Sequence, residues 1–345
     1  MRIPSLLAVL VSACAVLLGG CAGDEYEDLS TLHEQFALGP NSIVAEASAV
    51  YLSVGSRVEK RDEEGANPAV LSAAESLGAA PAAAYELTLS GVLLYWLRAT
   101  SPTYDSVLPA SDLRTEVVRV PTAGGTPEVV ARLAGAPTRR FAVNGDTLVT
   151  CDVPVPSGKP VVSFIGIAAQ TRATYPASED AALGCADLFI DASGSAHASI
   201  QMSLTSKRWV QVNASGTATA EGSPPSRPGV RWKHKSDTSN EADLVSTDAA
   251  GAETILTSGY DVPFVAEGST VYLMSGAGGG NRKTLECNTG GVSVIRNNNA
   301  PELLTKGQCG PRAFALTAKR VFWLDDRSIL YADGKPESSL KSLTR

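Results

Sequence analysis

The feature that most restricts how this chain can fold is a short pattern that recurs along it. Phe314–Asp326 reads FALTAKRVFWLDD, and Phe264–Gly276 reads FVAEGSTVYLMSG. In both, an alternating apolar strand is followed by a four-residue turn and a second strand that opens with Val and an aromatic residue. Five further copies are IVAEASAVY from Ile43, LTLSGVLLY from Leu87, FAVNGDTLV from Phe141, a degraded FIDASGSAH from Phe189, and one near Val230–Trp232 that shows only its second strand.

The copies are regularly spaced. We expect their second strands to begin at Val50, Leu94, Leu148, Ala196, Arg231, Val271 and Val321. The mean interval is about 45 residues, which is typical of β-propeller blades. A second hairpin lies between copies, around Gly65, Gly125, Gly216, Gly251, Asn298 and Gly334, with a less clearly turned segment at 161–175. Each period therefore contains about four short strands.

A lone four-stranded sheet cannot cover its own apolar faces, and stacking such sheets around a ring leaves only short edges exposed. We therefore predict an all-β protein in which residues 41–345 form a β-propeller of seven four-stranded blades. Six blades remain an alternative, because Ala196 and Arg231 are only 35 residues apart. The last period ends without a FALTAKR-type strand, and the first begins with one. We expect this N-terminal strand, Ile43–Glu46, to complete the last blade and close the ring.

The N-terminus has the pattern of a secretion signal. Arg2 precedes an apolar run from Leu6 to Leu18, which is about 20 Å long as a helix and too short to cross roughly 30 Å of hydrocarbon. The segment that ends in Cys21, LGGC, resembles the lipobox of bacterial lipoproteins. This resemblance implies that residues 1–20 are a lipoprotein signal peptide and that Cys21 is acylated; the alternative is an ordinary secreted protein with Cys21 free or paired. Ala22, in place of an aspartate, favours the outer membrane.

Residues 21–40 are expected to be an acidic tether followed by a short helix. GDEYED at 23–28 is strongly acidic, Thr31 and Glu34 match a capping box, and Gly39–Pro40 is a stop signal. The whole chain has a net charge of −7, which becomes −8 without residues 1–20 because Arg2 is lost. An acidic chain without a basic stripe repels phosphate, so we predict no nucleic-acid partner.

Cysteine usage agrees with an oxidising compartment. Beyond the signal and Cys21, the cysteines are Cys151, Cys185, Cys287 and Cys309, an even set that permits three pairings. We predict that neighbours in sequence pair, Cys151 with Cys185 and Cys287 with Cys309; each disulfide would contribute roughly 3 to 4 kcal/mol. The alternative is a zinc site. No CxxC is present and the histidines, His33, His197 and His234, do not cluster with the cysteines, so we predict no metal site.

The lipobox together with VPTAGG, FAVNGD and VYLMSG resembles the propeller lipoproteins of myxobacteria and related bacteria, which are broadly similar to NHL and TolB-type propellers. This resemblance covers nearly the whole mature chain. It implies the fold and a lipid-anchored place in the cell envelope, but it brings no shared catalytic residue. WD40 dipeptides and the in-register double glycine of kelch repeats are both missing.

Four local patterns could carry chemistry, and each has a plainer interpretation. GAGGGNRKT at Gly276–Thr284 has Arg282 where a phosphate loop needs glycine, so we interpret it as a blade loop. Asp325–Asp326 could bind a cation or act as a base at a channel mouth, or could be a solvated turn. His197 and His234 could meet on one rim or be unrelated. Ser338–Lys341 matches SxxK by composition in an expected frayed terminus. We predict no catalytic residue and no cofactor.

Two functional classes are compatible with this chain. The first is a lipid-anchored envelope module that binds or scaffolds a protein, peptide or glycan through one propeller face, where loops of every blade converge. A component of an envelope assembly is a variant of it. The alternative is a propeller hydrolase or lyase whose residues come from several blades and meet at the central channel. The fold alone does not choose between them.

Overall fold

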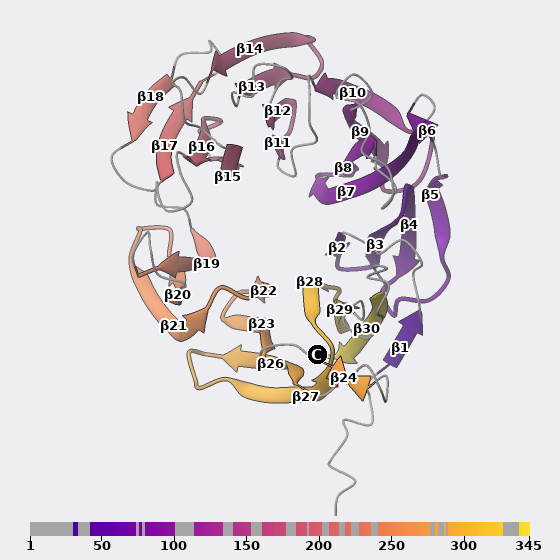
Figure 1. Ribbon diagram of the computed structural model, residues 1–345, viewed down its shortest axis with the longest axis vertical. Helices are drawn as coiled ribbons and strands as arrows, with labels where there is room; N and C mark the ends of the chain where they lie inside the picture. The colour runs from indigo at the N-terminus through magenta and orange to yellow at the C-terminus, as the bar shows by residue number, and fades with distance from the viewer. Residues whose placement is uncertain are drawn as a thin grey trace, which may run out of the picture.

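The structure is a computed structural model, and it describes residues 30–33, 42–73, 76–77, 80–100, 114–133, 141–152, 161–176, 184–191, 193–201, 207–213, 218–221, 228–235, 241–276, 280–281, 286–287, 289–326 and 338–345. Every regular element in this part of the chain is a β-strand. Seven antiparallel sheets are arranged around a ring (Figure 1). The protein is therefore a seven-bladed β-propeller, as the spacing of the repeat predicts.

The first three blades are complete four-stranded sheets. Blade 1 contains β2 (Ile43–Glu46), β3 (Ala49–Val54), β4 (Arg57–Asp62) and β5 (Ala69–Ser72). Blade 2 contains β7 (Ala80–Ser90), β8 (Leu93–Thr100), β9 (Thr115–Pro121) and β10 (Glu128–Leu133), with β6 (Ser76–Leu77) paired to the inner edge of β7. Blade 3 contains β11 (Phe141–Asn144), β12 (Thr147–Asp152), β13 (Val161–Gly166) and β14 (Thr171–Pro176).

The remaining blades differ in how many strands are described. Blade 4 contains β15 (Gly184–Ile190), β16 (Ala196–Gln201), β17 (Lys207–Val212) and β18 (Ala218–Glu221), and blade 5 contains β19 (Gly229–His234), β20 (Glu241–Thr247) and β21 (Glu253–Tyr260). Blade 6 contains β22 (Phe264–Glu267), β23 (Thr270–Ser275), β26 (Gly290–Arg296) and β27 (Glu302–Gln308), with the small hairpin β24 (Gly280–Asn281) and β25 (Glu286–Cys287) between β23 and β26. Blade 7 contains β28 (Pro311–Leu316), β29 (Arg320–Asp326), β30 (Ser338–Thr344) and β1 (Ser30–His33).

The second strand of a blade is its most deeply buried, which explains the sequence signature. β29 reads RVFWLDD, and its first six residues are all buried. This strand has a neighbour at each edge and a blade against each face, so both its inward and outward side chains are apolar. A continuous apolar run bounded by turns is the expected pattern for such a strand. The Val-plus-aromatic pair of the repeat therefore marks the middle of the blade.

Six hydrophobic clusters hold adjacent blades together. They lie between blades 1 and 2, 2 and 3, 3 and 4, 5 and 6, 6 and 7, and 7 and 1. The cluster between blades 7 and 1 joins the two ends of the ring and includes Ile43, Leu52, Phe322 and Leu340. In the described part of the chain, the junction between blades 4 and 5 has no such cluster.

An N-terminal strand closes the ring, but it is not the strand that we predicted. Ile43–Glu46 pairs with β3 in blade 1, and β1 instead completes blade 7 along the outer edge of β30. The pairing sets Ser30 opposite Ser342 and Thr31 opposite Lys341. The predicted helix from Thr31 is therefore wrong over Ser30–His33; residues 34–41 lie outside the described residues. The ring also begins before the predicted boundary at residue 41.

Blade 5 keeps the predicted register of the repeat. Antiparallel strands alternate in direction, so the first and third strands of a blade end at one face of the ring and the second and fourth end at the other. The first strand of the next blade starts at the face where a fourth strand ends. Because β21 leads to β22, the first strand of blade 6, β21 is equivalent to a fourth strand. β19 is then equivalent to a second strand, which is the position predicted for Arg231. Residues 222–227, which precede this strand, lie outside the described residues.

Candidate functional site

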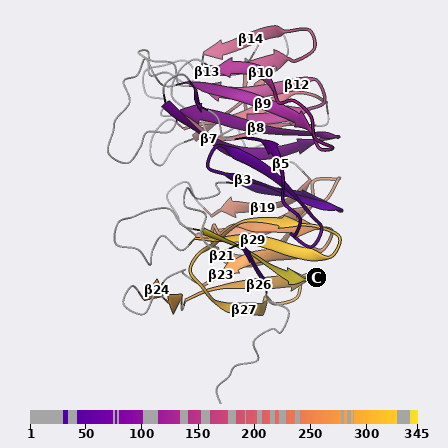
Figure 2. The same ribbon diagram turned by 90° about the vertical axis from the view of Figure 1, so that its right-hand side faces the viewer.

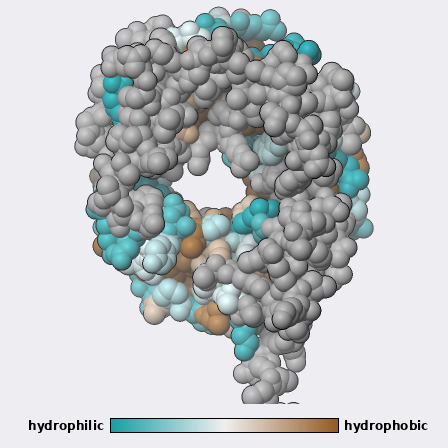
Figure 3. Space-filling view, viewed as in Figure 1, coloured by the Kyte–Doolittle hydropathy of each residue, from teal (hydrophilic) through white to brown (hydrophobic). Residues whose placement is uncertain are grey.

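The two faces of the ring differ in the length of their connections. Turns between the first and second strands, and between the third and fourth, lie at one face, which we call the short-turn face; none is longer than the six residues of 63–68 and 122–127. At the opposite face, which we call the long-loop face, lie the strand ends that the other connections join; 14 residues separate β8 from β9, and 14 separate β23 from β26. Figure 2 shows the strands crossing between these faces, and Figure 3 shows the central opening.

Both disulfides lie at strand ends on the long-loop face. Cys151 at the end of β12 bonds to Cys185 in β15, with 6.2 Å between the Cα atoms. Cys287 in β25 bonds to Cys309, which follows β27, with 4.5 Å between the Cα atoms. This is the pairing that we predicted. The first bond links blades 3 and 4, and the second ties the connection 276–289 to the entrance of blade 7.

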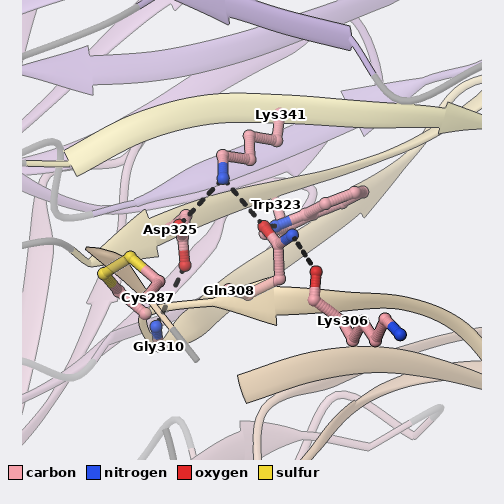
Figure 4. The surroundings of a disulfide bond; sticks show 8 residues. Cys287, Lys306, Gln308, Gly310, Trp323, Asp325 and Lys341 are labelled. Carbon is pink, nitrogen blue, oxygen red and sulfur yellow. Dashed lines mark hydrogen bonds and ion pairs between the residues drawn. A yellow bond between two sulfur atoms is a disulfide. The ribbon is translucent and has the colours of Figure 1, made fainter. Parts of the chain in front are cut away.

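Asp325 holds strands together, and Figure 4 shows its contacts with Gly310 and Lys341. Its side chain is fully buried, and its Oδ1 accepts a hydrogen bond from the Gly310 backbone N–H at 3.0 Å. The Lys341 ammonium lies 3.1 Å from Oδ2 and also donates to Gln308 Oε1 at 3.0 Å. Trp323 Nε1 lies 3.4 Å from the same amide oxygen. Because the carboxylate is buried and neutralised, it does not offer a free ligand at the channel mouth.

The other acid of the predicted pair is also engaged. Asp326 lies 2.9 Å from Arg312 in an ion pair. Neither the catalytic interpretation nor the solvated turn describes Asp325, since this residue is buried within a sheet. Asp325 does lie near the sulfurs of Cys287 and Cys309, all within 4.8 Å of one another. Those sulfurs are bonded to each other, so the group is not a set of metal ligands in the oxidised protein.

The histidines do not come together. His197 is the second residue of β16, and His234 is the last residue of β19. Both strands are equivalent to second strands and run in the same direction across the ring, so the two residues lie toward opposite faces. His197 Nε2 is instead 2.9 Å from Asp191 Oδ2, and its ring stacks on Phe189 with 4.8 Å between centroids. Of the two interpretations given above, the structure supports the one in which the histidines are unrelated.

Asp191, His197 and Ser193 contain the residue types of a hydrolase triad but not its geometry. Ser193 Oγ donates to Asp191 Oδ1 at 2.6 Å, and the Asp191 carboxylate stands between the serine and the imidazole. A triad needs the serine hydroxyl next to the imidazole. Burial alone would raise the pKa of Asp191, but hydrogen bonds from His197, Ser193 and Ser195 outweigh it and lower the pKa to about 2. The carboxylate is held ionised as part of a turn.

The same turn occurs three times on the short-turn face, and its sequence signal is Asp-x-x-Gly. The aspartates are Asp62, Asp191 and Asp248. In each, the aspartate Oδ1 accepts the backbone N–H groups two and four residues later. The glycine three residues after the aspartate has a φ of 81°, 85° or 87°, a conformation that suits glycine. Our sequence analysis overlooked this signal, which identifies turns and not a catalytic site.

The two remaining motifs also belong to the blades. In GAGGGNRKT, Gly280 and Asn281 form β24 and pair with β25; residues 277–279 and 282–285 lie outside the described residues. Ser338 and Ser339 are fully buried in β30, so the segment is not a frayed terminus. Ser338 Oγ accepts a hydrogen bond from Arg312 at 3.0 Å. The SxxK match is therefore part of the sheet.

A small pocket of about 210 Å³ lies between blades 5 and 6 at the short-turn face. Its lining residues are Val230, Ser246, Thr254, Leu256, Gly268, Ser269, Val271 and Asn298. From the sequence, Val230, Val271 and Asn298 marked only strands and turns, because the lining residues come from β19 and from three separate hairpins. In the described part of the chain, no helix has the length and hydropathy needed to cross a membrane.

Comparison with known proteins supports the fold. No protein-family model and no curated protein matches the sequence. The β-propeller domain of the Trilobed protease from Pyrococcus furiosus is similar in structure, with a TM-score of 0.52 and 8% identity over 90% of this chain and 96% of that one. TolB from Acinetobacter baumannii matches with a TM-score of 0.38 and 13% identity, over 100% of this chain and 71% of that one. The similarity to the Trilobed protease domain, at 8% identity, supports the fold class, a β-propeller, and nothing narrower.

Proposed function

We propose that this protein is a lipid-anchored binding module of the bacterial cell envelope, which recognises a protein, peptide or glycan through its long-loop face. The observation that carries the proposal is the asymmetry of the ring. Long connections and both disulfides gather at one face, and loops on a rigid propeller are well suited to recognition. The lipobox that ends in Cys21 supports the anchor.

Partner capture from native membranes tests recognition by this face. Tyr260 ends β21 on the long-loop face and is 68% exposed, whereas Val92 lies in a turn on the short-turn face and is 74% exposed. Exposed tyrosines are frequent energetic anchors of interfaces. We expect Tyr260→Ala to reduce the recovered partner several-fold and Val92→Ala to leave it unchanged. Recovery that falls only with Val92→Ala would assign recognition to the other face.

Metabolic labelling with a fatty-acid analogue tests the anchor. We expect Cys21→Ser to abolish labelling and membrane retention, because the thiol is the acylation site in a lipobox. Cys14→Ser is a matched control inside the signal segment and should retain both. Equal labelling of the two variants would rule out Cys21 as the lipid site. Density fractionation of labelled membranes then separates outer from inner membrane.

The alternative, a propeller hydrolase or lyase with a site at the central channel, makes a different prediction. Purified protein would turn over a substrate, and channel-facing substitutions would reduce turnover without loss of folding. Asp191, Ser193 and His197 do not support this alternative, because the serine bonds the aspartate and not the imidazole.

A further inference from the structure

The pocket between blades 5 and 6 lies on a face where side chains bridge the next two junctions along the chain. At the next junctions, Arg345 of blade 7 pairs with Glu267 of blade 6, and Lys319 of blade 7 lies 2.6 Å from Glu63 of blade 1. Between blades 5 and 6 the corresponding place is hollow, with about 210 Å³ open to solvent. This volume is smaller than the roughly 300–1,000 Å³ of pockets for drug-sized molecules. A ligand for it would be correspondingly small.

The walls of the pocket are apolar below and polar at the rim. Val230, Leu256 and Val271 form an aliphatic part, and Val271 is almost fully buried. The polar part, which supplies the hydrogen-bonding groups, comes from Ser246 and Thr254 of blade 5 and from Ser269 and Asn298 of blade 6. A compact ligand with C–H groups on one side and hydroxyls on the other would match both parts.

Most of these polar side chains are available to a ligand. Those of Ser246, Thr254 and Asn298 make no hydrogen bond to other described residues. Ser269 Oγ donates to Asn297 Oδ1 at 2.9 Å, which leaves its lone pairs free to accept. Gly268 sits at the rim with a φ of 57°, and a Cβ placed there would meet no atom within 4 Å, so the turn leaves the entrance open.

No charged side chain lines the pocket. Three charged residues are adjacent in sequence to lining residues. Arg231 and Glu253 alternate to the other face of their strands and pair with each other, and Glu267 pairs with Arg345. Lys233 adds a second ion pair to Glu253. With these charges compensated, the pocket offers neither an anion nor a cation a partner, and it favours an uncharged ligand.

We propose that this pocket binds one neutral sugar unit, with its C–H face on the aliphatic part and its hydroxyls on the serine, threonine and asparagine groups. The site is on the opposite face from the proposed partner surface and goes beyond that function. Binding by a few neutral hydrogen bonds and little buried area corresponds to a dissociation constant in the millimolar range. The sugar could be free or the terminal residue of a glycan.

Ligand-observed saturation-transfer NMR on the full chain, in a detergent without a sugar head group, tests this. The probes are glucose, mannose and N-acetylglucosamine, each beside its methyl glycoside, with methyl glucuronide as the charged comparison. We expect saturation of at least one neutral sugar and weaker binding of the glucuronide. If a sugar and its methyl glycoside bind equally, the pocket can accept the terminal residue of a glycan. If only the free sugar binds, the ligand is a free sugar.

Two substitutions on one strand place the binding in the pocket. Thr254→Arg fills it from the exposed rim, and we expect at least about a tenfold loss of affinity. Ile255→Arg changes the neighbouring residue, which is 59% exposed and faces the other side of β21, and should stay within about twofold. Ser246→Ala should cost about two- to tenfold, the effect of one neutral hydrogen bond. The proposal would be overturned if no neutral sugar shows saturation, or if the Thr254 and Ile255 variants lose affinity equally. The effect of Tyr260→Ala on partner capture tests the proposed function and is independent of this result.

Discussion

At the scale of single residues, side chains that were candidates for catalysis or metal binding instead hold strands and turns in place. Asp325 is the clearest case, because its buried carboxylate is compensated by an ammonium that comes from the next strand of the sheet. Removing one partner of a buried ion pair leaves an uncompensated charge, which costs more than the pair itself contributes. We therefore expect that replacing one partner lowers the stability of the protein strongly and that replacing both together lowers it less.

We expect Lys341→Met to lower the free energy of unfolding by about 3 to 5 kcal/mol, measured by urea denaturation with the disulfides intact. The double variant Asp325→Asn, Lys341→Met should recover part of this loss because no buried charge remains. If the double variant is as unstable as the single one, lost packing of Lys341 and not the unpaired carboxylate explains the effect.

Asp191 gives a pH-dependent prediction. Its folded-state pKa of about 2 lies below the unfolded value near 3.9, so its contribution to stability is present above about pH 4 and is lost as the pH falls toward 2. The side chain is partly exposed, so solvent screening limits the contribution to about 1 kcal/mol. The stability difference between the wild type and Asp191→Asn should shrink over this pH range. A difference that is constant from pH 6 to pH 2 would contradict the assignment.

At the scale of elements, the position of β1 decides how the ring ends. Without it, β30 would expose its outer edge, a row of unpaired backbone groups. The contact is four residues long and lies about 300 residues away in sequence from its partner. Such a pairing depends on the completed ring, and no local pattern in Ser30–His33 encodes it.

The variant Ser30→Pro, Thr31→Pro tests this strand. Successive N–H groups of a strand point to opposite sides, so one of the two prolines removes a donor to β30 whichever way β1 faces. We expect a loss of about 1 to 3 kcal/mol and faster hydrogen exchange in residues 338–344. Ser30→Ala, Thr31→Ala keeps both N–H groups and should have little effect. Unchanged exchange in the proline variant would show that β1 does not protect this edge.

At the scale of the whole molecule, the ring is not uniformly held. Six junctions have a hydrophobic cluster, including the junction where the chain ends meet. Across the junction between blades 4 and 5, the described side chains include His197, Arg231 and Glu253, which are polar or charged. Because apolar burial is the main favourable term in packing, this junction should open more easily than the others.

Native-state hydrogen exchange checks this expectation. We expect β19–β21 and the facing strands of blade 4 to exchange through a lower-energy opening than β2–β4 and β28–β30, the strands at the ring closure. Addition of low denaturant should reveal the opening as a separate exchange unit. Equal protection at the two junctions would mean that the segments outside the described residues supply the missing packing.

The sequence by itself determined the repeat, its spacing and the register of the second strands, because these follow from local alternation and turn residues. It favoured seven blades over six and one of three cysteine pairings, and the structure shows both of these choices. Only the tertiary structure decided that Ser30–His33 closes the ring, that Asp325 is buried against Lys341, that His197 and His234 lie toward opposite faces, and that β19 and three hairpins enclose a pocket. These outcomes depend on contacts between distant segments. A repeat specifies the blade well, but it says little about the side chains that face each other where two blades meet.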